Sequence, residues 1–76
     1  MELKDFIESF ANVFDDTDED VFTADCKFQE LDEWGSLAAL GVIAFVKTEY
    51  GKKITGQEVR SCETIEELFK FVKNAE

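Results

Sequence analysis

Histidine and proline are both absent from this chain of 76 residues. Without histidine the protein lacks the commonest general base and the commonest metal ligand, which excludes Ser-His and Cys-His catalysis. We therefore expect that it is not an enzyme. The two cysteines, Cys26 and Cys62, are too few for a disulfide framework and have no Cys-x-x-Cys spacing. We expect both to be reduced, mostly buried thiols in a cytoplasmic protein.

Positive charge is scarce. The chain has 8 Lys and Arg against 18 Asp and Glu, which gives a formal net charge of −10. Phosphate groups would be repelled rather than neutralised, so this balance argues against nucleic acid and anionic membrane surfaces as partners. A protein partner should instead present a basic patch, and the attraction would speed the encounter at low salt.

Long apolar runs are missing as well. The longest stretch without charge covers 13 residues, from Trp34 to Val46, whereas a membrane-spanning helix needs about 20. The first residues also lack the basic start and apolar run of a secretion signal. We expect no membrane insertion, and we expect residues 1–76 to form one domain, because a second would not fit in this length.

Apolar residues are nevertheless plentiful. Leu, Ile, Val and Phe make up 23 residues, or 30% of the chain, above the roughly 20% that marks disordered sequences. Eight of them are Phe. We therefore expect a folded chain with a thin core, since a domain this small buries only about 60% of the surface that its unfolded chain exposes.

Two long segments have the pattern of helices. Residues 2–14 repeat apolar side chains at three- and four-residue steps on one face. Residues 37–50 are apolar on almost every side, which is typical of a central helix or of one with a second face for a partner. Ser36 is suited to cap the start of this helix, and Gly51 is suited to end it.

Two shorter helices follow, and no segment alternates as a strand would. Thr55 can cap a short, weak helix that ends at Ser61. Thr64-Ile65-Glu66-Glu67 is a capping-box sequence that opens the last helix. The predicted fold class is all-α: a small four-helix bundle of three main helices and one short helix, with a long first loop.

That loop, residues 15–33, begins with an acidic run. Asp16, Asp18 and Asp20 match the first three ligand positions of an EF-hand, but Val21 replaces the required Gly and Lys27 replaces the bidentate Glu. We expect a solvated acidic loop and no metal site, with loose divalent binding at high concentration as the remaining alternative. Four apolar side chains are expected to pin the loop to the core: Val21, Phe22, Phe28 and Leu31.

The strongest motif is Trp34-Gly35-Ser36-Leu37, where the long loop enters the apolar helix. Ser36 has no internal base, so it cannot serve as a catalytic nucleophile. Two interpretations remain for its hydroxyl group. It is either a plain helix cap or the substrate of another enzyme.

At this motif the chain resembles the acyl and peptidyl carrier protein family. Members of that family carry an Asp-Ser-Leu or Gly-Ser-Leu motif at the start of their second helix. The resemblance covers about residues 28–73 and includes the apolar anchors before the motif, the aromatic-Gly end of the second helix and the Thr that opens the last one. The matching residues are Phe28, Leu31, Leu37, Leu40, Tyr50, Gly51, Ile54, Thr64, Ile65, Leu68 and Val72.

The resemblance implies a function as an acyl carrier protein. A phosphopantetheinyl transferase would attach 4′-phosphopantetheine to Ser36, and the thiol of that arm would carry an acyl or aminoacyl group as a thioester. Acyl-loading and acyl-transferring enzymes would be the other partners of a monomeric carrier that serves fatty-acid, polyketide or specialised lipid biosynthesis. The side chains expected to meet these enzymes are Trp34, Gly35, Leu37, Leu40 and Ala44.

The family also implies a place for the acyl chain. Its members can part their helices to shelter the chain, and four apolar residues fit either that role or plain core. These residues are Phe45, Val46, Val59 and Ile65.

The chain departs from the family at two points. Gly35 stands where most members have Asp, which puts in doubt which transferase acts on Ser36. Residues 36–50 carry only Lys47 and Glu49, whereas fatty-acid-synthesis members line this helix with acids. We therefore expect a specialised carrier with a different docking surface. The alternative is a non-carrier acidic helical module that binds a basic or apolar partner.

Overall fold

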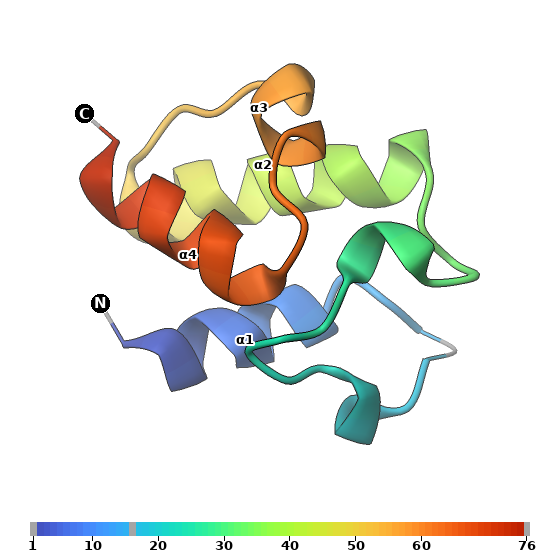
Figure 1. Ribbon diagram of the computed structural model, residues 1–76. Coiled ribbons are helices and arrows are strands. Elements are labelled where there is room, and N and C mark those ends of the chain that lie inside the picture. The colour runs from blue at the N-terminus through green and yellow to red at the C-terminus, as the bar shows by residue number, and fades with distance from the viewer. Residues whose placement is uncertain (1, 16, 76) are drawn as a thin grey trace.

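The computed structural model describes residues 2–15 and 17–75. Within them the chain forms four α-helices and two 3₁₀ turns, and none of these residues lies in a strand. The all-helical prediction, with three longer helices and one short one, is confirmed (Figure 1). The elements are α1 (Leu3–Ala11), η1 (Glu19–Val21), η2 (Phe28–Glu30), α2 (Ser36–Tyr50), α3 (Gly56–Arg60) and α4 (Ile65–Asn74).

The helices pack around a shared apolar core. Helix α1 packs against α2 and α4, and α2 also packs against α3. Figure 1 shows the two chain ends on one side of the molecule and the start of α2 on the opposite side, beside the long loop. No helix in the described ranges has the length and apolar character needed to cross a membrane.

Helix α1 is shorter than the predicted residues 2–14. It ends at Ala11, and the next residues form a turn in which the N–H groups of Val13 and Phe14 donate to carbonyls three residues earlier. Phe14 is still buried. The apolar spacing of residues 2–14 is therefore satisfied partly by a helix and partly by a tighter turn, whose side chains reach the same core.

Phe10 lies at the centre of an aromatic cluster, and its side chain has no exposed surface. Five other aromatic rings have centroids 5.3–6.4 Å from its own. They come from the long loop, from α2 and from the turn after α1, so one side chain of α1 joins all three. These rings belong to Phe14, Phe22, Phe28, Trp34 and Phe45.

The long loop is pinned by fewer apolar side chains than expected. Phe22 and Phe28 are buried and Leu31 is half-buried, but Val21 is 42% exposed and so does not anchor the loop. Val21 is the last residue of the one-turn helix η1, and the next side chain, that of Phe22, is the one buried in the core.

Hydrogen bonds supply the rest of the anchoring. The side-chain amide of Gln29 donates to the carbonyls of Arg60 and Cys62 at 2.8 and 2.6 Å. The backbone N–H of Ile65 donates to the carbonyl of Cys26 at 3.1 Å. These bonds fix the loop to the end of α3 and to the start of α4, so the loop presents a defined surface.

Threonine caps begin both α3 and α4, as predicted. At α3 the Thr55 hydroxyl accepts from the Glu58 N–H, and the Glu58 carboxylate accepts from the Thr55 N–H at 2.8 Å, which completes a capping box. At α4 the Thr64 hydroxyl accepts from the Glu67 N–H. The predicted capping box is only half formed at α4, because the Glu67 carboxylate accepts from the Thr64 hydroxyl at 3.3 Å instead of from the Thr64 N–H.

Replacing Thr55 with Ala should lower the free energy of unfolding by about 1 kcal/mol, because the Glu58 N–H then loses its acceptor. Urea denaturation monitored by circular dichroism measures the change. Thr48→Ala is the matched control, since Thr48 lies exposed within α2. Equal effects of the two substitutions would show that the cap contributes nothing specific.

Candidate functional site

Ser36 is exposed at the first position of α2. The prediction that it caps the helix is wrong. Gly35 occupies the cap position with an extended backbone, and no side chain of residues 2–15 or 17–75 caps this end. The reason is that Ser36 already has helical geometry, so its hydroxyl group is not directed back to the free N–H groups of the first turn. No described residue hydrogen-bonds to this hydroxyl group.

The first turn of α2 also leaves backbone donors available. The first helical hydrogen bond runs from the Ala39 N–H to the Gly35 carbonyl at 3.0 Å, so the N–H groups of residues 36–38 precede the hydrogen-bonded part of the helix. The first turn contains no acidic side chain. A Cβ built on Gly35 would meet no atom within 4 Å, so the space beside it is open. Such a helix start favours a negatively charged group.

Three of the predicted partner-contact residues lie on the surface beside Ser36. Leu37 is 83% exposed and Leu40 is 62% exposed, and Ala44 continues the same face one turn further along α2. The opposite face of α2 is buried through Ala38, Val42 and Val46. The apolar character of α2 therefore divides into a core face and a solvent face.

Trp34 is placed differently from these three residues. Its ring is half-buried, with its centroid 4.9 Å from that of Phe28 and 6.3 Å from that of Phe14. The side chain thus ties the residues before Ser36 to the aromatic core. Because the ring is anchored, the backbone that enters α2 is held in place at Gly35.

A groove of about 520 Å³ lies beside this start of α2. Its apolar walls come from the turn after α1 and from α2, which approach closely at Gly41: a Cβ there would lie 2.8 Å from the Cγ1 of Val13. Asp15 and Glu33 add carboxylates at its edge. Glu33 is held in place by the Thr17 hydroxyl, which donates to its carboxylate. The sequence did not predict that these two acids lie near each other, because they stand at opposite ends of the long loop, residues 15–33.

The residues suggested as shelter for an acyl chain belong to the core. Val46, Val59 and Ile65 have no exposed surface, and Phe45 is half-buried against Phe6. In this conformation their side chains pack in the core and do not line a cavity that could hold an acyl chain. The structure therefore agrees with the plain-core interpretation.

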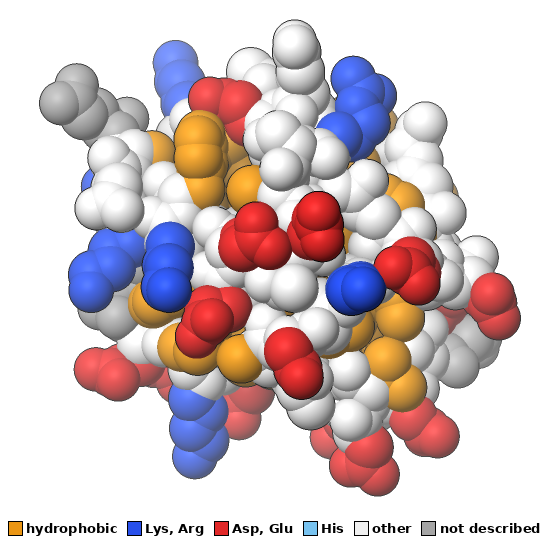
Figure 2. Space-filling model, viewed as in Figure 1, with side chains coloured by type: hydrophobic (Ala, Val, Ile, Leu, Met, Phe, Trp, Pro, Cys, Tyr) orange, Lys and Arg blue, Asp and Glu red, His pale blue; other side chains and the backbone are white. Residues whose placement is uncertain are grey.

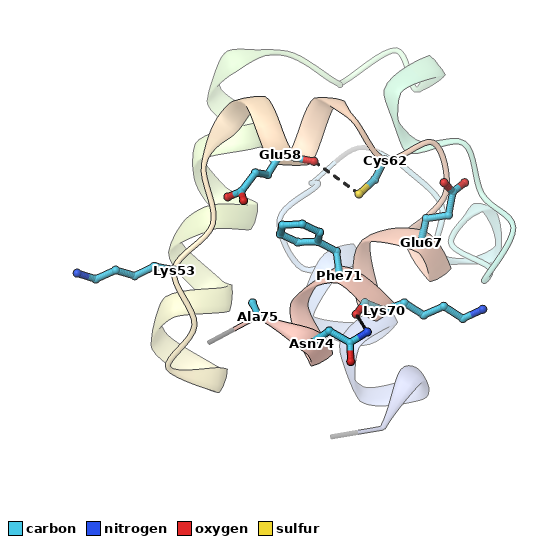
Figure 3. A pocket seen from close by; sticks show the side chains of 8 residues that line it. All are labelled: Lys53, Glu58, Cys62, Glu67, Lys70, Phe71, Asn74 and Ala75. Atoms are coloured by element: carbon cyan, nitrogen blue, oxygen red, sulfur yellow. Dashed lines mark hydrogen bonds between the residues drawn. The ribbon is translucent and has the colours of Figure 1, made fainter.

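A second groove, of about 650 Å³, lies between α3 and α4 and away from Ser36. Figure 3 shows Phe71 directed between Glu58 and Cys62, whose thiol donates to the Glu58 carbonyl at 3.5 Å. Burial raises the pKa of the Cys62 thiol, and burial likewise raises the pKa of Cys26. Both thiols are free and buried, as predicted, and both are therefore expected to be un-ionised and slow to react at neutral pH.

The acidic run does not assemble a metal site in the described part of the chain. Asp16 lies outside that part, and Asp18 and Asp20 are exposed on either side of Glu19. Among the described residues no three Cys, Asp or Glu side chains are grouped so that they could hold a metal ion.

Comparison with known proteins adds no relative. No family model matches the chain, and neither a curated protein nor a solved structure matches it. The function must therefore be argued from the site itself.

Replacing Gly35 with Asp should raise the free energy of unfolding by about 1 kcal/mol. The extended backbone accepts any residue, and the new carboxylate can accept from the free N–H of Leu37 or Ala38. This bond would lower the pKa of the carboxyl group in the folded state. The gain is therefore present above the unfolded-state pKa of about 3.9 and is lost as the pH falls through the folded-state value.

Urea denaturation at neutral and acidic pH measures this gain. Gly35→Ala is the control, because it removes the flexibility of glycine without adding an acceptor. An equal gain in both variants would show that capping is not the cause.

Proposed function

We propose that the protein is an acyl carrier protein that bears 4′-phosphopantetheine on Ser36. The observation that carries the proposal is the exposed hydroxyl group of Ser36 at the start of α2, where no residue in the described part of the chain hydrogen-bonds to it. This position combines access for an enzyme with the backbone N–H groups of a helix start, which favour an attached phosphate. The motif resemblance around residues 34–37 and the four-helix arrangement support the same function.

The residues present fit the phosphopantetheine group. The phosphodiester would lie beside the free N–H groups of residues 36–38, in the open space next to Gly35. The first turn of α2 holds no carboxylate, and no capping side chain among the residues that the structure describes competes for this position. When attached, the group supplies a flexible arm with a terminal thiol that can form a thioester.

The attachment reaction is a phosphoryl transfer onto Ser36. The Oγ of Ser36 attacks the pantetheine-bearing phosphorus of coenzyme A, and a new phosphorus–oxygen bond forms. The bond between that phosphorus and the oxygen bridging to the second phosphate breaks, and adenosine 3′,5′-bisphosphate leaves. The hydroxyl proton passes to a base on the transferase, because the chain has no histidine and no described residue hydrogen-bonds to the Ser36 hydroxyl. In this reaction the carrier is the substrate and the transferase is the enzyme.

The carrier can be specialised for one group of partners. Its second helix carries only Lys47 and Glu49, and the Glu49 carboxylate accepts from the Ser9 hydroxyl at 2.8 Å. An enzyme that recognises an acidic second helix finds little to bind there. We therefore place the cargo in polyketide, specialised lipid or aminoacyl chemistry.

The test is incubation with coenzyme A, Mg²⁺ and a broad-specificity phosphopantetheinyl transferase. The expected product has gained one phosphopantetheinyl group by intact mass and one thiol that reacts rapidly with a disulfide reagent. Cys26 and Cys62 provide the internal reference, since burial keeps their pKa values raised and their reaction slow. A chain that gains neither mass nor a fast thiol with any transferase tested would favour the non-carrier interaction module instead.

A further inference from the structure

The side chain of Gln29 joins two parts of the fold that lie far apart in the sequence. Its amide nitrogen donates to the carbonyls of Arg60 and Cys62 at 2.8 and 2.6 Å. A side-chain amide has two N–H donors, so Gln29 can serve both carbonyls at once. The last carbonyls of a helix have no partners within it, and Arg60 is the last residue of α3. Gln29 therefore closes the end of α3 and at the same time holds η2 against it.

The surface around this junction is charged. A groove of about 380 Å³ beside Gln29 is lined by charged side chains, and none of its described lining residues is hydrophobic. Figure 2 shows charged side chains of both signs over the face on which η2, α3 and α4 meet. Exposed charges hold two segments together only weakly, so the short bonds of Gln29 provide the specific link. The charged residues of the groove are Lys27, Glu30, Arg60 and Glu63.

Tight turns connect η2 to the residues just before Ser36. The N–H groups of Glu30, Leu31 and Trp34 each donate to the carbonyl three residues earlier, with N···O distances of 3.0–3.2 Å. The Trp34 ring also packs against the ring of Phe28, with centroids 4.9 Å apart. A displacement of η2 is therefore passed along these turns to Trp34, two residues before Ser36.

Gln29 lies closer to Ser36 than the backbone bonds that attach the loop to α4. The Ile65 N–H donates to the Cys26 carbonyl at 3.1 Å, and the Glu66 N–H donates to the Ala24 carbonyl at 2.9 Å. Both acceptors precede η2 in the chain. The bonds of Gln29 follow them and fix η2 itself, from which the turns lead to α2.

We propose that Gln29 is a positioning residue for the modification of Ser36. Its bonds to the end of α3 fix the segment of residues 29–35, which presents the serine hydroxyl to the transferase. The inference rests on the proposed function, because it concerns the same attachment reaction. Gln29 acts through this segment and needs no contact with the transferase.

Loss of the Gln29 bonds has a specific kinetic consequence. The freed segment samples several conformations, and the transferase binds only the fraction of chains that presents Ser36 correctly. Apparent affinity falls in proportion to that fraction, whereas a chain that is correctly bound reacts as before. The KM of the transferase for the chain should therefore rise while kcat stays unchanged.

The test compares Gln29→Met and Gln29→Asn with the parent chain. Met has a similar length but no N–H donor, and Asn keeps the amide but is one methylene too short to reach both carbonyls. Thr55→Ala is the matched control, because it removes the cap at the other end of α3 and leaves the Gln29 bonds in place. Urea denaturation gives the folded fraction of each variant under the assay conditions.

Two measurements are made on every variant. Initial rates of Ser36 modification at increasing chain concentration, with coenzyme A, Mg²⁺ and a phosphopantetheinyl transferase, give kcat and KM. The decay of fluorescence anisotropy of Trp34, the one tryptophan of the chain, reports nanosecond motion of the segment without any transferase.

Both Gln29 variants should raise KM about fivefold, keep kcat within about twofold of the parent and increase the motion of Trp34. Thr55→Ala should change none of these quantities. An unchanged KM or unchanged Trp34 motion in the Gln29 variants would overturn the proposal, as would an equal rise of KM in Thr55→Ala. A parent chain that no transferase modifies refutes the carrier function, and the motion of Trp34 then decides by itself whether Gln29 fixes the segment.

Discussion

Phe10→Ala should leave little folded protein under ordinary conditions. Replacing a fully buried Phe with Ala costs about 3–5 kcal/mol, because apolar contacts are lost and a cavity remains. A core in a chain of this size seldom supplies more than about 3–5 kcal/mol of net stability. Since Phe10 has no exposed surface and contacts rings from α2, the loop and the turn after α1, the loss should approach the whole free energy of unfolding.

Thermal denaturation followed by circular dichroism measures this effect. Phe71→Ala provides a matched control with the same chemical change at a half-buried position on α4. That variant should remain folded with a smaller loss. If Phe10→Ala unfolded at the same temperature as Phe71→Ala, the aromatic cluster would not be the centre of stability.

The capping rules predicted the start of a helix correctly where only one residue was suited to the cap position. Thr55 and Thr64 each precede an acid by three residues, and the backbone follows that rule in both cases. At α2 the rule gave the wrong residue. Gly35 and Ser36 are both acceptable cap residues, and composition alone does not decide which of two neighbours takes the extended backbone.

Local sequence rules did not fully predict which residues of the long loop are buried. Its buried residues follow no period of two or of 3.6, so nothing in the pattern distinguished exposed Val21 from buried Phe22. The bonds of Gln29 join it to carbonyls about 30 residues away in the chain. Contacts over that separation depend on how α3 and α4 pack, which periodicity does not specify.

Within the candidate site, the exposed residues of α2 were predicted from the sequence, whereas the two carboxylates beside them were not. Motif resemblance indicated that Leu37, Leu40 and Ala44 form a surface, although their hydropathy alone favours burial, and all three are exposed. The sequence pattern showed that Asp15 and Glu33 belong to an acidic loop, but it did not predict their position beside α2. Their position beside α2 follows from the folding of the loop, which the sequence pattern did not determine.

Ser36→Ala should abolish phosphopantetheine attachment without lowering stability. The substitution removes the hydroxyl oxygen that forms the new bond to phosphorus, so the mass of the variant should stay unchanged in a reaction that converts the parent chain. Ser61→Ala is the matched control, because Ser61 lies at the end of α3 and its hydroxyl donates to the Glu58 carbonyl. That variant should gain one phosphopantetheinyl group as the parent does.

The stability of Ser36→Ala separates the two interpretations of this serine. A capping serine replaced by Ala costs about 1 kcal/mol. No residue in the described ranges hydrogen-bonds to the Ser36 hydroxyl, and the residue has helical geometry, where Ala is favoured by a few tenths of a kcal/mol. Urea denaturation should therefore show a free energy of unfolding equal to that of the parent or slightly higher. A loss of about 1 kcal/mol together with continued modification would contradict both the geometry of the helix start and the role of Ser36 as the attachment site.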